Sequence, residues 1–283
     1  MDKKEMKGRR NGFWKISVFA FLFAVLAFIN IGCASTDMIY VPESGNQTIQ
    51  QAVDNATAGD TIVVRDSTYN ENVNVNVAHL TIRSQNGTAN CIVNASDSGD
   101  HVFNVTADYV NISEFTVTGA TTGWSNAGIY LNGTDHCNIS DNFASSNNCG
   151  IYLNSSSSNN LTSNTASSNN CGIYLNSSSS NNLTSNTASS NNQIGIYLNS
   201  SSNNTFMSNI ASDNSHGIYL WYSSNNTFMS NIASDNSHGI ILSFSSNNNL
   251  TSNTINSNNN YGISMWSSSN NILYHNNLIN NTN

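Results

Sequence analysis

Hydrophobic and polar residues alternate along most of the chain in a pattern that returns every 22 or 23 residues. Each repeat opens with Gly-Ile, continues with one further residue and then carries Leu or Met. Such alternation points every second side chain to the same side of a β-strand. Clusters of Ser and Asn, which favour turns, separate the alternating runs. The pattern therefore predicts short strands and tight turns, in repeats that open at Gly128, Gly150, Gly172, Gly195, Gly217, Gly239 and Gly262.

The fixed period predicts the architecture of residues 128–283. Units of about 20 to 50 residues with constant offsets are typical of solenoids, in which each coil buries its apolar face against its neighbours. Each unit holds two or three short strands and no helical pattern. The strands are therefore expected to stack in parallel as a β-helix with coils of about 22 residues. The predicted fold class is all-β.

Residues 35–127 lack the strict period and are predicted to form the cap and the irregular first coils of the same domain. The sequence Thr48-Ile49-Gln50-Gln51 has the form of a helix capping box, and the apolar residues that follow lie on one helical face. The first coil of a solenoid exposes its core and its sheet edges, so a short helix is expected to cover it. Strands are predicted at 61–64, 73–77, 80–83, 102–105 and 115–117.

Residues 1–34 have the composition of a secretory signal peptide. Six Lys and Arg residues lie among the first fifteen, an apolar run follows from 16 to 31, and small residues surround Cys33. This composition predicts cleavage after Ala34 and export to the cell surface or the extracellular space. Lipidation of Cys33 and retention as an uncleaved anchor are the alternatives, although the apolar run is shorter than the ~20 residues of a spanning helix.

The distribution of charge excludes nucleic acid as a partner. Beyond residue 34 the chain has 2 basic residues, Arg65 and Arg83, and 14 acidic ones, a net charge of −12. Nucleic-acid binding needs many Lys and Arg contacts with phosphates. The same scarcity limits catalysis, because no Lys or Arg follows Arg83 and the regular repeats hold only four acids.

An asparagine stands fourteen residues after each of the seven glycines. In stacked coils these side chains would form a ladder in which each amide bonds to its copies on the coils above and below. Asparagine also tolerates left-handed backbone, so the ladder is predicted to lie at a tight corner. Its members are Asn142, Asn164, Asn186, Asn209, Asn231, Asn253 and Asn276.

Cys149 and Cys171 precede successive glycines and are predicted to lie side by side on adjacent coils, about 4.8 Å apart. That spacing lies within the Cα range of a disulfide, and an exported protein meets oxidising conditions. A disulfide and a pair of buried thiols both remain open.

The residue two places after the glycine is predicted to point outward, and it is tyrosine in five consecutive repeats. A stripe of phenol rings would offer sugar rings an aromatic surface, which Trp221 and Trp266 would extend. The alternative is that the rings only stabilise the sheet as cross-strand pairs. The predicted binding residues are Tyr130, Tyr152, Tyr174, Tyr197, Tyr219 and Trp221.

Two near-identical repeats stack His216 on His238 and Met207 on Met229. Imidazole and thioether are ligands that suit Cu(I). The two pairs are expected on different sides of a coil, where they could not share one ion, and two histidines alone make a weak site. The two histidines are therefore the metal candidates, with simple turn positions as the alternative.

The same two repeats stack Asp213 on Asp235. Two neighbouring carboxylates repel, so one would keep its proton and become an acid for polysaccharide cleavage. The alternative is that both are ordinary turn residues, copied together with the repeat.

The units Gly-Ile-Tyr-Leu, Asn-Asn-Leu-Thr-Ser-Asn-Thr and Ser-Asn-Asn resemble the NosD-type right-handed β-helix repeat. The segment from Thr48 to Val64 resembles the N-terminal cap of pectin-lyase-like proteins. The resemblance implies a right-handed parallel β-helix with a short N-terminal capping helix. The chain is similar to exported surface proteins of methanogenic archaea, and the family name implies copper handling. Members include epimerases, lyases, hydrolases, adhesins and copper-accessory proteins, so fold alone does not decide activity.

These features predict an exported, non-catalytic cell-surface protein that binds glycans or other surface proteins through the tyrosine stripe. A copper-binding accessory protein of the NosD type and a polysaccharide-cleaving enzyme are the alternatives. The residues predict no cofactor, and copper is implied by the resemblance alone. Residues 276–283 supply no capping helix, which predicts an open last coil and leaves a truncated chain, end-to-end self-association and partner docking as the alternatives. Glycosylation triplets occur at positions that include Asn86, Asn94, Asn104, Asn132, Asn154, Asn160, Asn176, Asn203, Asn225 and Asn249.

Overall fold

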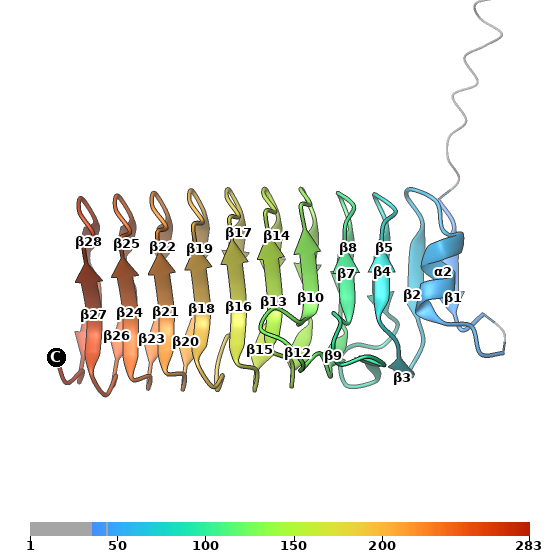
Figure 1. Cartoon of the computed structure of the whole chain (residues 1–283), viewed down its shortest axis with the longest axis horizontal. Helices are drawn as coiled ribbons and strands as arrows, with labels where there is room; N and C mark the ends of the chain where they lie inside the picture. Colours follow the sequence, from blue (N-terminus) through green and yellow to red (C-terminus); the bar gives the residue numbers. More distant parts are fainter. Residues whose placement is uncertain (1–35, 44) are drawn as a thin grey trace, which may run out of the picture. The chain divides into compact units, whose positions relative to one another are not determined.

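Parallel strands wind around one apolar interior in the computed structural model, which describes residues 36–43 and 45–283 (Figure 1). Residues 36–283 form one compact unit. The signal-peptide prediction for residues 1–34, with its alternatives at Cys33, lies outside the described residues. Among those that are described, no helix is long and apolar enough to cross a membrane.

Most coils contribute one strand to each of three faces, here called sheets 1, 2 and 3, and all strand pairs are parallel. The prediction of an all-β parallel solenoid with coils of about 22 residues is therefore confirmed. Sheet 1 has eleven strands: β1 (Met38–Val41), β2 (Thr61–Val64), β5 (Thr81–Ser84), β8 (Asn111–Ser113), β11 (Asn138–Ser140), β14 (Asn160–Thr162), β17 (Asn182–Thr184), β19 (Thr205–Met207), β22 (Thr227–Met229), β25 (Asn249–Thr251) and β28 (Ile272–Tyr274).

Sheet 2 has the longest strands, and sheet 3 is interrupted once. Sheet 2 consists of β4 (Val73–Val75), β7 (Phe103–Val105), β10 (Ala127–Asn132), β13 (Cys149–Asn154), β16 (Cys171–Asn176), β18 (Ile194–Asn199), β21 (His216–Trp221), β24 (His238–Ser243) and β27 (Tyr261–Trp266). Sheet 3 consists of β3 (Ser67–Asn70), β6 (Cys91–Asn94), β9 (Thr116–Thr118), β12 (Phe143–Ser145) and β15 (Thr165–Ser167), then of β20 (Ile210–Ser212), β23 (Ile232–Ser234), β26 (Thr254–Asn256) and β29 (Asn277–Ile279). Bridges at Thr187 join the two parts.

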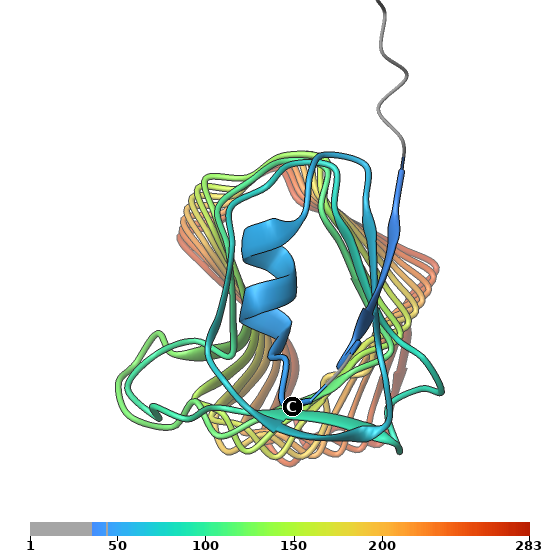
Figure 2. The same ribbon diagram turned by 90° about the vertical axis from the view of Figure 1, so that its right-hand side faces the viewer.

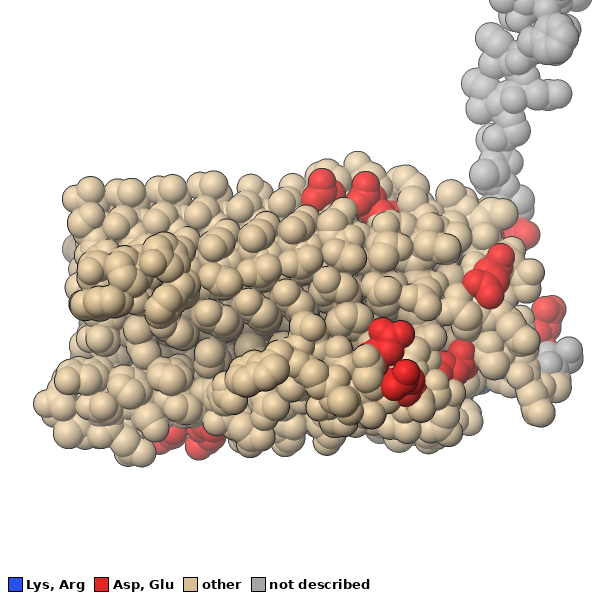
Figure 3. Space-filling model, in the orientation of Figure 1, with Lys and Arg blue, Asp and Glu red and all other residues tan. Residues whose placement is uncertain are grey.

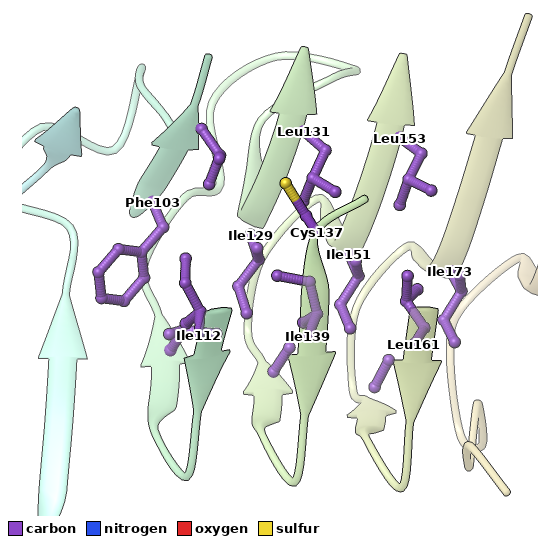
Figure 4. Packing of buried hydrophobic residues seen from close by; sticks show 14 of the residues in the cluster. Phe103, Ile112, Ile129, Leu131, Cys137, Ile139, Ile151, Leu153, Leu161 and Ile173 are labelled. Atoms are coloured by element: carbon purple, nitrogen blue, oxygen red, sulfur yellow. The ribbon is translucent and has the colours of Figure 1, made fainter. Parts of the chain in front are cut away.

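The interior is filled by the apolar member of each alternating run (Figure 4). In one coil Ile151 and Leu153 point inward from sheet 2, Leu161 from sheet 1 and Ala166 from sheet 3, and all are 0% exposed. Strand register places each beside its equivalent on the next coil, as Ile151 lies beside Ile173. Burial of a large aliphatic side chain contributes about 1.5–3 kcal/mol, so the stacked rows supply the main stabilisation.

The seven asparagines of the predicted ladder are all placed at one corner, between sheets 1 and 3. Asn164 illustrates the pattern, because its Nδ2 donates to the Ile139 carbonyl at 2.7 Å and to Asn186 Oδ1 at 3.0 Å. Its own backbone N–H donates to the same Oδ1 at 3.0 Å. Each buried amide therefore satisfies backbone groups of the neighbouring coil as well as its own copies.

The left-handed backbone lies one residue earlier than predicted. It is the residue before each ladder asparagine that has positive φ, and this residue is usually serine, as at Ser163, Ser185 and Ser208 with φ of 56° to 57°. The asparagine keeps ordinary backbone because its side chain must turn inward to reach the next coil. A short serine can take the left-handed corner at a modest cost.

Three further ladders line the other corners. Two are buried asparagines at offsets nine and nineteen from the glycine, with the Asn181 and Asn191 backbone N–H groups donating to Oδ1 of Asn204 and Asn214. The third is a serine ladder, in which the Ser178 N–H donates to Ser201 Oγ at 3.0 Å. All corners of the regular coils therefore carry a continuous row of buried hydrogen bonds.

The predicted cap is present as α2 (Ile49–Asn55), which lies across the opening of the first coils (Figure 2). Both bonds of the capping box form, since the Gln51 N–H donates to Thr48 Oγ1 and the Thr48 N–H to Gln51 Oε1, each at 3.1 Å. Ile49, Ala52 and Val53 are buried against the interior. The strand at 61–64 is confirmed, and the other four predicted strands are present with shifted ends. The strands β1, β3, β6 and β8 were not predicted.

Candidate functional site

The five tyrosines form one column on the outer side of sheet 2, where β10, β13, β16, β18 and β21 pair in register. Neighbouring ring centroids are 4.6 to 5.3 Å apart. From Tyr152 to Tyr219 the planes of neighbouring rings differ by only 7° to 19°, so the rings stack face to face. Their flat faces are therefore covered by one another, and the column presents ring edges and hydroxyls instead of the open aromatic surface that the sequence suggests.

The tyrosine column is also more buried than an ordinary outward strand position. Tyr152 is only 7% exposed, and the other four rings are half-buried. Burial raises the pKa of the Tyr152 and Tyr197 phenols well above its usual value of 10. Burial also raises the pKa of Tyr130, and a hydrogen bond with Asn154 partly offsets this rise. These phenols therefore stay protonated and uncharged at neutral pH.

A groove of about 440 Å³ follows the column, and this is the candidate site. Besides four tyrosines it is lined by Trp124 and Ser125, which belong to the loop between β9 and β10. Hydrogen bonds from Thr122 to Ser98 hold this loop, with N···O and O···O distances of 2.9 and 3.0 Å. Trp124 is 82% exposed, so the tryptophan supplies the open aromatic face that the stacked tyrosines lack.

A column of amide side chains also lines the groove. Asn148, Asn170 and Gln193 stand two places before their glycines, and their backbones are hydrogen-bonded from coil to coil, as from Gln193 N to Asn170 O at 2.9 Å. The Asn170 amide is also held by Asn192, whose Nδ2 donates to its Oδ1 at 3.0 Å. An amide offers both donors and an acceptor, as hydroxyl-rich ligands require.

His101 lies at the N-terminal end of the column and stacks on Tyr130, with ring centroids 4.0 Å apart. Its Nδ1 accepts the Ala127 backbone N–H at 3.0 Å, so Nε2 carries the proton of the neutral ring. Burial lowers the pKa of His101, which keeps this end of the column uncharged at neutral pH.

Residues 127–282 match the family described as the right-handed β-helix region, which covers more than half of the chain. The chain belongs to the right-handed β-helix family. No curated protein matches the sequence of this β-helix.

Solved structures of low sequence identity share the β-helix architecture. One is the A-module of a mannuronan C-5 epimerase of Azotobacter vinelandii, with 16% identity and a TM-score of 0.69 over 80% of this chain and 69% of that chain. An alginate lyase of Paenibacillus sp. has 17% identity and a TM-score of 0.61 over 85% and 99%. The active domain of tailspike protein 2 of bacteriophage CBA120 has 13% identity and a TM-score of 0.69 over 87% and 43%. At such identities the likeness shows the fold alone.

Trp221 does not line the groove of the β-helix and belongs to a second aromatic cluster. It meets Tyr219 edge-on at 6.0 Å and Tyr222 at 5.5 Å. Phe244 and Trp266 continue the cluster toward the C-terminal coils, with centroids 4.4 Å apart. Trp266 is 60% exposed, so this cluster forms an aromatic surface next to the groove.

Cys149 and Cys171 are paired in register on β13 and β16, as predicted from their spacing, and both thiols are free. Both also line the groove. The hydrogen bond between the thiols, together with burial, raises the pKa of Cys171 well above its usual value of 9. The disulfide stays a prediction.

The position directly before the glycine forms a single column that holds the cysteines and both metal-candidate histidines, separated by Ile194. The imidazoles of His216 and His238 are 5.1 Å apart, and both Nδ1 atoms are buried without a hydrogen bond. Met207 and Met229 end strands of sheet 1, on a different face. Within the described part of the chain, no three His, Cys, Asp or Glu residues come together as a metal-binding group.

Asp213 and Asp235 are exposed residues at left-handed corners, with φ of 57° and 58°. Serine occupies the equivalent corner of earlier coils, as at Ser190 with φ of 57°. This placement favours the interpretation as turn residues. Aspartate belongs to the residues that tolerate such backbone.

The last described coil leaves apolar residues uncovered. Leu273 and Leu278 are 39% and 54% exposed, whereas Leu250 and Ile255, their equivalents one coil earlier, are fully buried. End-to-end self-association stays a prediction.

Proposed function

We propose that this β-helix is an exported, non-catalytic cell-surface protein that binds carbohydrate in the groove beside the tyrosine column. The observation that carries the proposal is the lining of this 440 Å³ groove, which combines the exposed face of Trp124, phenol hydroxyls and a column of amides. Aromatic faces accept the apolar side of a sugar ring, while amides and phenols exchange hydrogen bonds with its hydroxyls. Binding sites of this kind need few but well-placed polar groups.

The chemistry of the lining supports binding without catalysis. None of the residues that line the groove is Asp, Glu, His, Lys or Arg. Cleavage of a glycosidic bond or removal of a sugar proton needs a general acid or base within hydrogen-bond reach. The lining offers only phenols and thiols for this role, and burial keeps the Tyr152 and Tyr197 phenols protonated at neutral pH, so they do not act as bases there. The related folds named as a mannuronan epimerase and an alginate lyase act on polysaccharides, which supports a carbohydrate ligand.

The test is binding of residues 35–283 to a broad glycan array, with Trp124→Ala and Trp266→Ala as a matched pair. Both tryptophans are exposed, at 82% and 60%, but only Trp124 lines the groove. We expect glycan binding that falls at least tenfold in Trp124→Ala and is unchanged in Trp266→Ala. No detectable binding to any glycan on the array, or binding that does not depend on Trp124, would contradict the proposal.

Copper binding is the second candidate function, and it rests on the unpaired Nδ1 atoms of His216 and His238. Two imidazoles 5.1 Å apart offer a soft metal ion two ligands on one face of the β-helix. Anaerobic Cu(I) titration of the protein and of the His216→Ala, His238→Ala double variant tests it. Stoichiometric binding that the double variant loses would support copper, and equal uptake by both proteins would remove it.

A further inference from the structure

We infer that the groove selects neutral oligosaccharides and excludes chains that carry carboxylates or sulfates. This inference rests on the proposed function and specifies the class of ligand for the same groove. It follows from the electrostatics of the lining and of its surroundings.

The lining has no formal charge at neutral pH. Its polar members are amides, hydroxyls, thiols and phenols. The phenols are protonated because burial raises their pKa, as at Tyr152, and the His101 ring at the end of the column is neutral. A bound carboxylate would find hydrogen-bond donors here but no positive charge.

No Lys or Arg among the described residues can supply the missing positive charge. Arg65 and Arg83 are the only Lys or Arg residues after residue 34, and both lie in the first coils, on or next to strands of sheet 1. Arg65 is engaged with the Pro42 carbonyl and the Tyr40 ring, and Arg83 with the Ser84 carbonyl. Neither lines the groove.

Acidic residues lie close in sequence to the Ser98 contact of the Trp124 loop and at the corners before β21 and β24. Asp97 and Asp100 flank Ser98, the residue that holds the Trp124 loop. Asp213 and Asp235 occupy the corners that lead into β21 and β24. Figure 3 shows the acidic side chains gathered over the N-terminal coils, with a separate group further along. The summed field is therefore negative and repels an anionic chain.

Desolvation adds to this repulsion. A carboxylate that leaves water without a partner cation loses far more hydration free energy than a hydroxyl does. The hydroxyls of a neutral sugar, in contrast, can replace their water contacts with Asn148, Asn170 and Gln193. Because the lining repeats once per coil, a chain that lies along the solenoid axis meets similar groups at each step.

The experiment compares one ligand in two charge states. The strongest neutral binder on the array is prepared as a tetra- to hexasaccharide, and its primary hydroxyls are oxidised to carboxylates in a second sample. We expect the oxidised form to bind at least tenfold more weakly at low salt, with the gap narrowing as NaCl is added, because screening weakens the repulsion. Calorimetric titration of both forms measures the ratio of Kd values.

A charge substitution within the groove sharpens the test. Gln193 is exposed and its side chain makes no hydrogen bond within the described residues, so Gln193→Lys adds a cation with little effect on folding, and Gln193→Met is the matched uncharged variant. We expect Gln193→Lys to recover most of the lost affinity for the oxidised ligand and Gln193→Met to recover none.

The outcomes separate this inference from the proposed function. If the strongest array ligands are uronic acid or sulfated chains, or if the two charge states bind equally, the selectivity is overturned while the groove remains a carbohydrate site. If no saccharide of either kind binds, the proposed function fails and the inference fails with it.

Discussion

The coils before and after Gly128 build the same three sheets but satisfy their corners in different ways. In the regular coils every corner is a row of identical buried amides or hydroxyls, such as Asn164 and Asn186, bonded from coil to coil. In the first coils single charged side chains satisfy backbone groups instead: Glu71 accepts the N–H groups of Ile49 and Gln50 at the start of the cap helix α2, at 2.9 and 3.0 Å. The regular coils thus use neutral ladders where the first coils use individual charged side chains.

The contrast also appears in the charges. Ten of the 14 acidic residues beyond residue 34 lie before Gly128, together with both arginines. The groove begins where the two regions meet, because the Trp124 loop comes from the irregular coils and the tyrosine column from the regular ones. The regular coils supply the tyrosine column, and the irregular coils supply Trp124, which lines the groove beside it.

The largest expected change in stability comes from a substitution that disturbs the stacking of the regular coils. A Cβ at Gly172 would lie 2.6 Å from the Gly195 carbonyl and 2.8 Å from Asn191 Nδ2, both fixed by the next coil. We expect Gly172→Ala to lower the free energy of unfolding by about 3 kcal/mol, measured by urea denaturation.

Gly133→Ser is the control for Gly172→Ala. Gly133 has φ of 64° and open space around its Cβ position, and later coils carry serine with positive φ at the equivalent corner, as at Ser155 and Ser177. We expect a change below about 0.5 kcal/mol. A Gly172→Ala protein as stable as Gly133→Ser would show that the coils can separate without cost.

A smaller effect is expected from interrupting one ladder. Asn186→Ala removes the acceptor of the buried Asn164 N–H and one of the donors to the Leu161 carbonyl. We expect a loss of about 2 kcal/mol in the free energy of unfolding. Asn182→Ala, an exposed position on the same coil, should change it by less than about 0.5 kcal/mol. Equal effects would mean that the ladders add nothing beyond ordinary packing.

The irregular coils should respond to pH through a buried carboxylate, Asp60. Asp60 is buried and accepts the backbone N–H groups of Thr57 at 2.7 Å and Asp37 at 2.8 Å, which lower its pKa. A carboxylate with a lowered folded-state pKa stabilises the fold above its unfolded pKa of about 4, and this stabilisation is lost as the pH falls through the lower folded value.

We therefore expect Asp60→Asn to cost about 1 kcal/mol in the free energy of unfolding between about pH 5 and 8 and progressively less below about pH 4. Urea denaturation at several pH values measures this difference. The Gly172→Ala defect should stay constant over the same range, because no ionisable group takes part in it. A cost for Asp60→Asn that does not change with pH would rule out the ionised carboxylate as its cause.

The smallest effect on stability is expected from substitution of Trp124, which lines the groove. Trp124 is 82% exposed, so Trp124→Ala should change the free energy of unfolding by less than about 0.5 kcal/mol, measured by denaturation. A large loss of stability would show that the tryptophan holds its loop, and the binding result for this variant would then need a milder substitution such as Trp124→Phe.

The amino-acid sequence was sufficient to predict the solenoid, the cap and the residues that point inward. In a repeat protein most contacts join equivalent positions one period apart, so the period that places Gly150 and Gly172 also predicts which residues touch. The capping box at Thr48 is a local signal of the same kind. Asparagine also stands at offset nineteen in all seven repeats and at offset nine in six of them, where the first repeat has Cys137. A buried asparagine cannot be told from an exposed one, however, until the corner geometry is known.

The candidate site, in contrast, could be located only in the three-dimensional structure. The groove depends on contacts between positions that are not equivalent, such as the Thr122 hydrogen bonds to Ser98 that hold Trp124 beside the tyrosine column. The tilt that makes the tyrosine rings stack on one another is also set by packing against neighbouring coils. The period of the sequence predicts the features that occur in every coil. A loop that occurs once, and the orientation of a side chain within its column, depend on the three-dimensional surroundings.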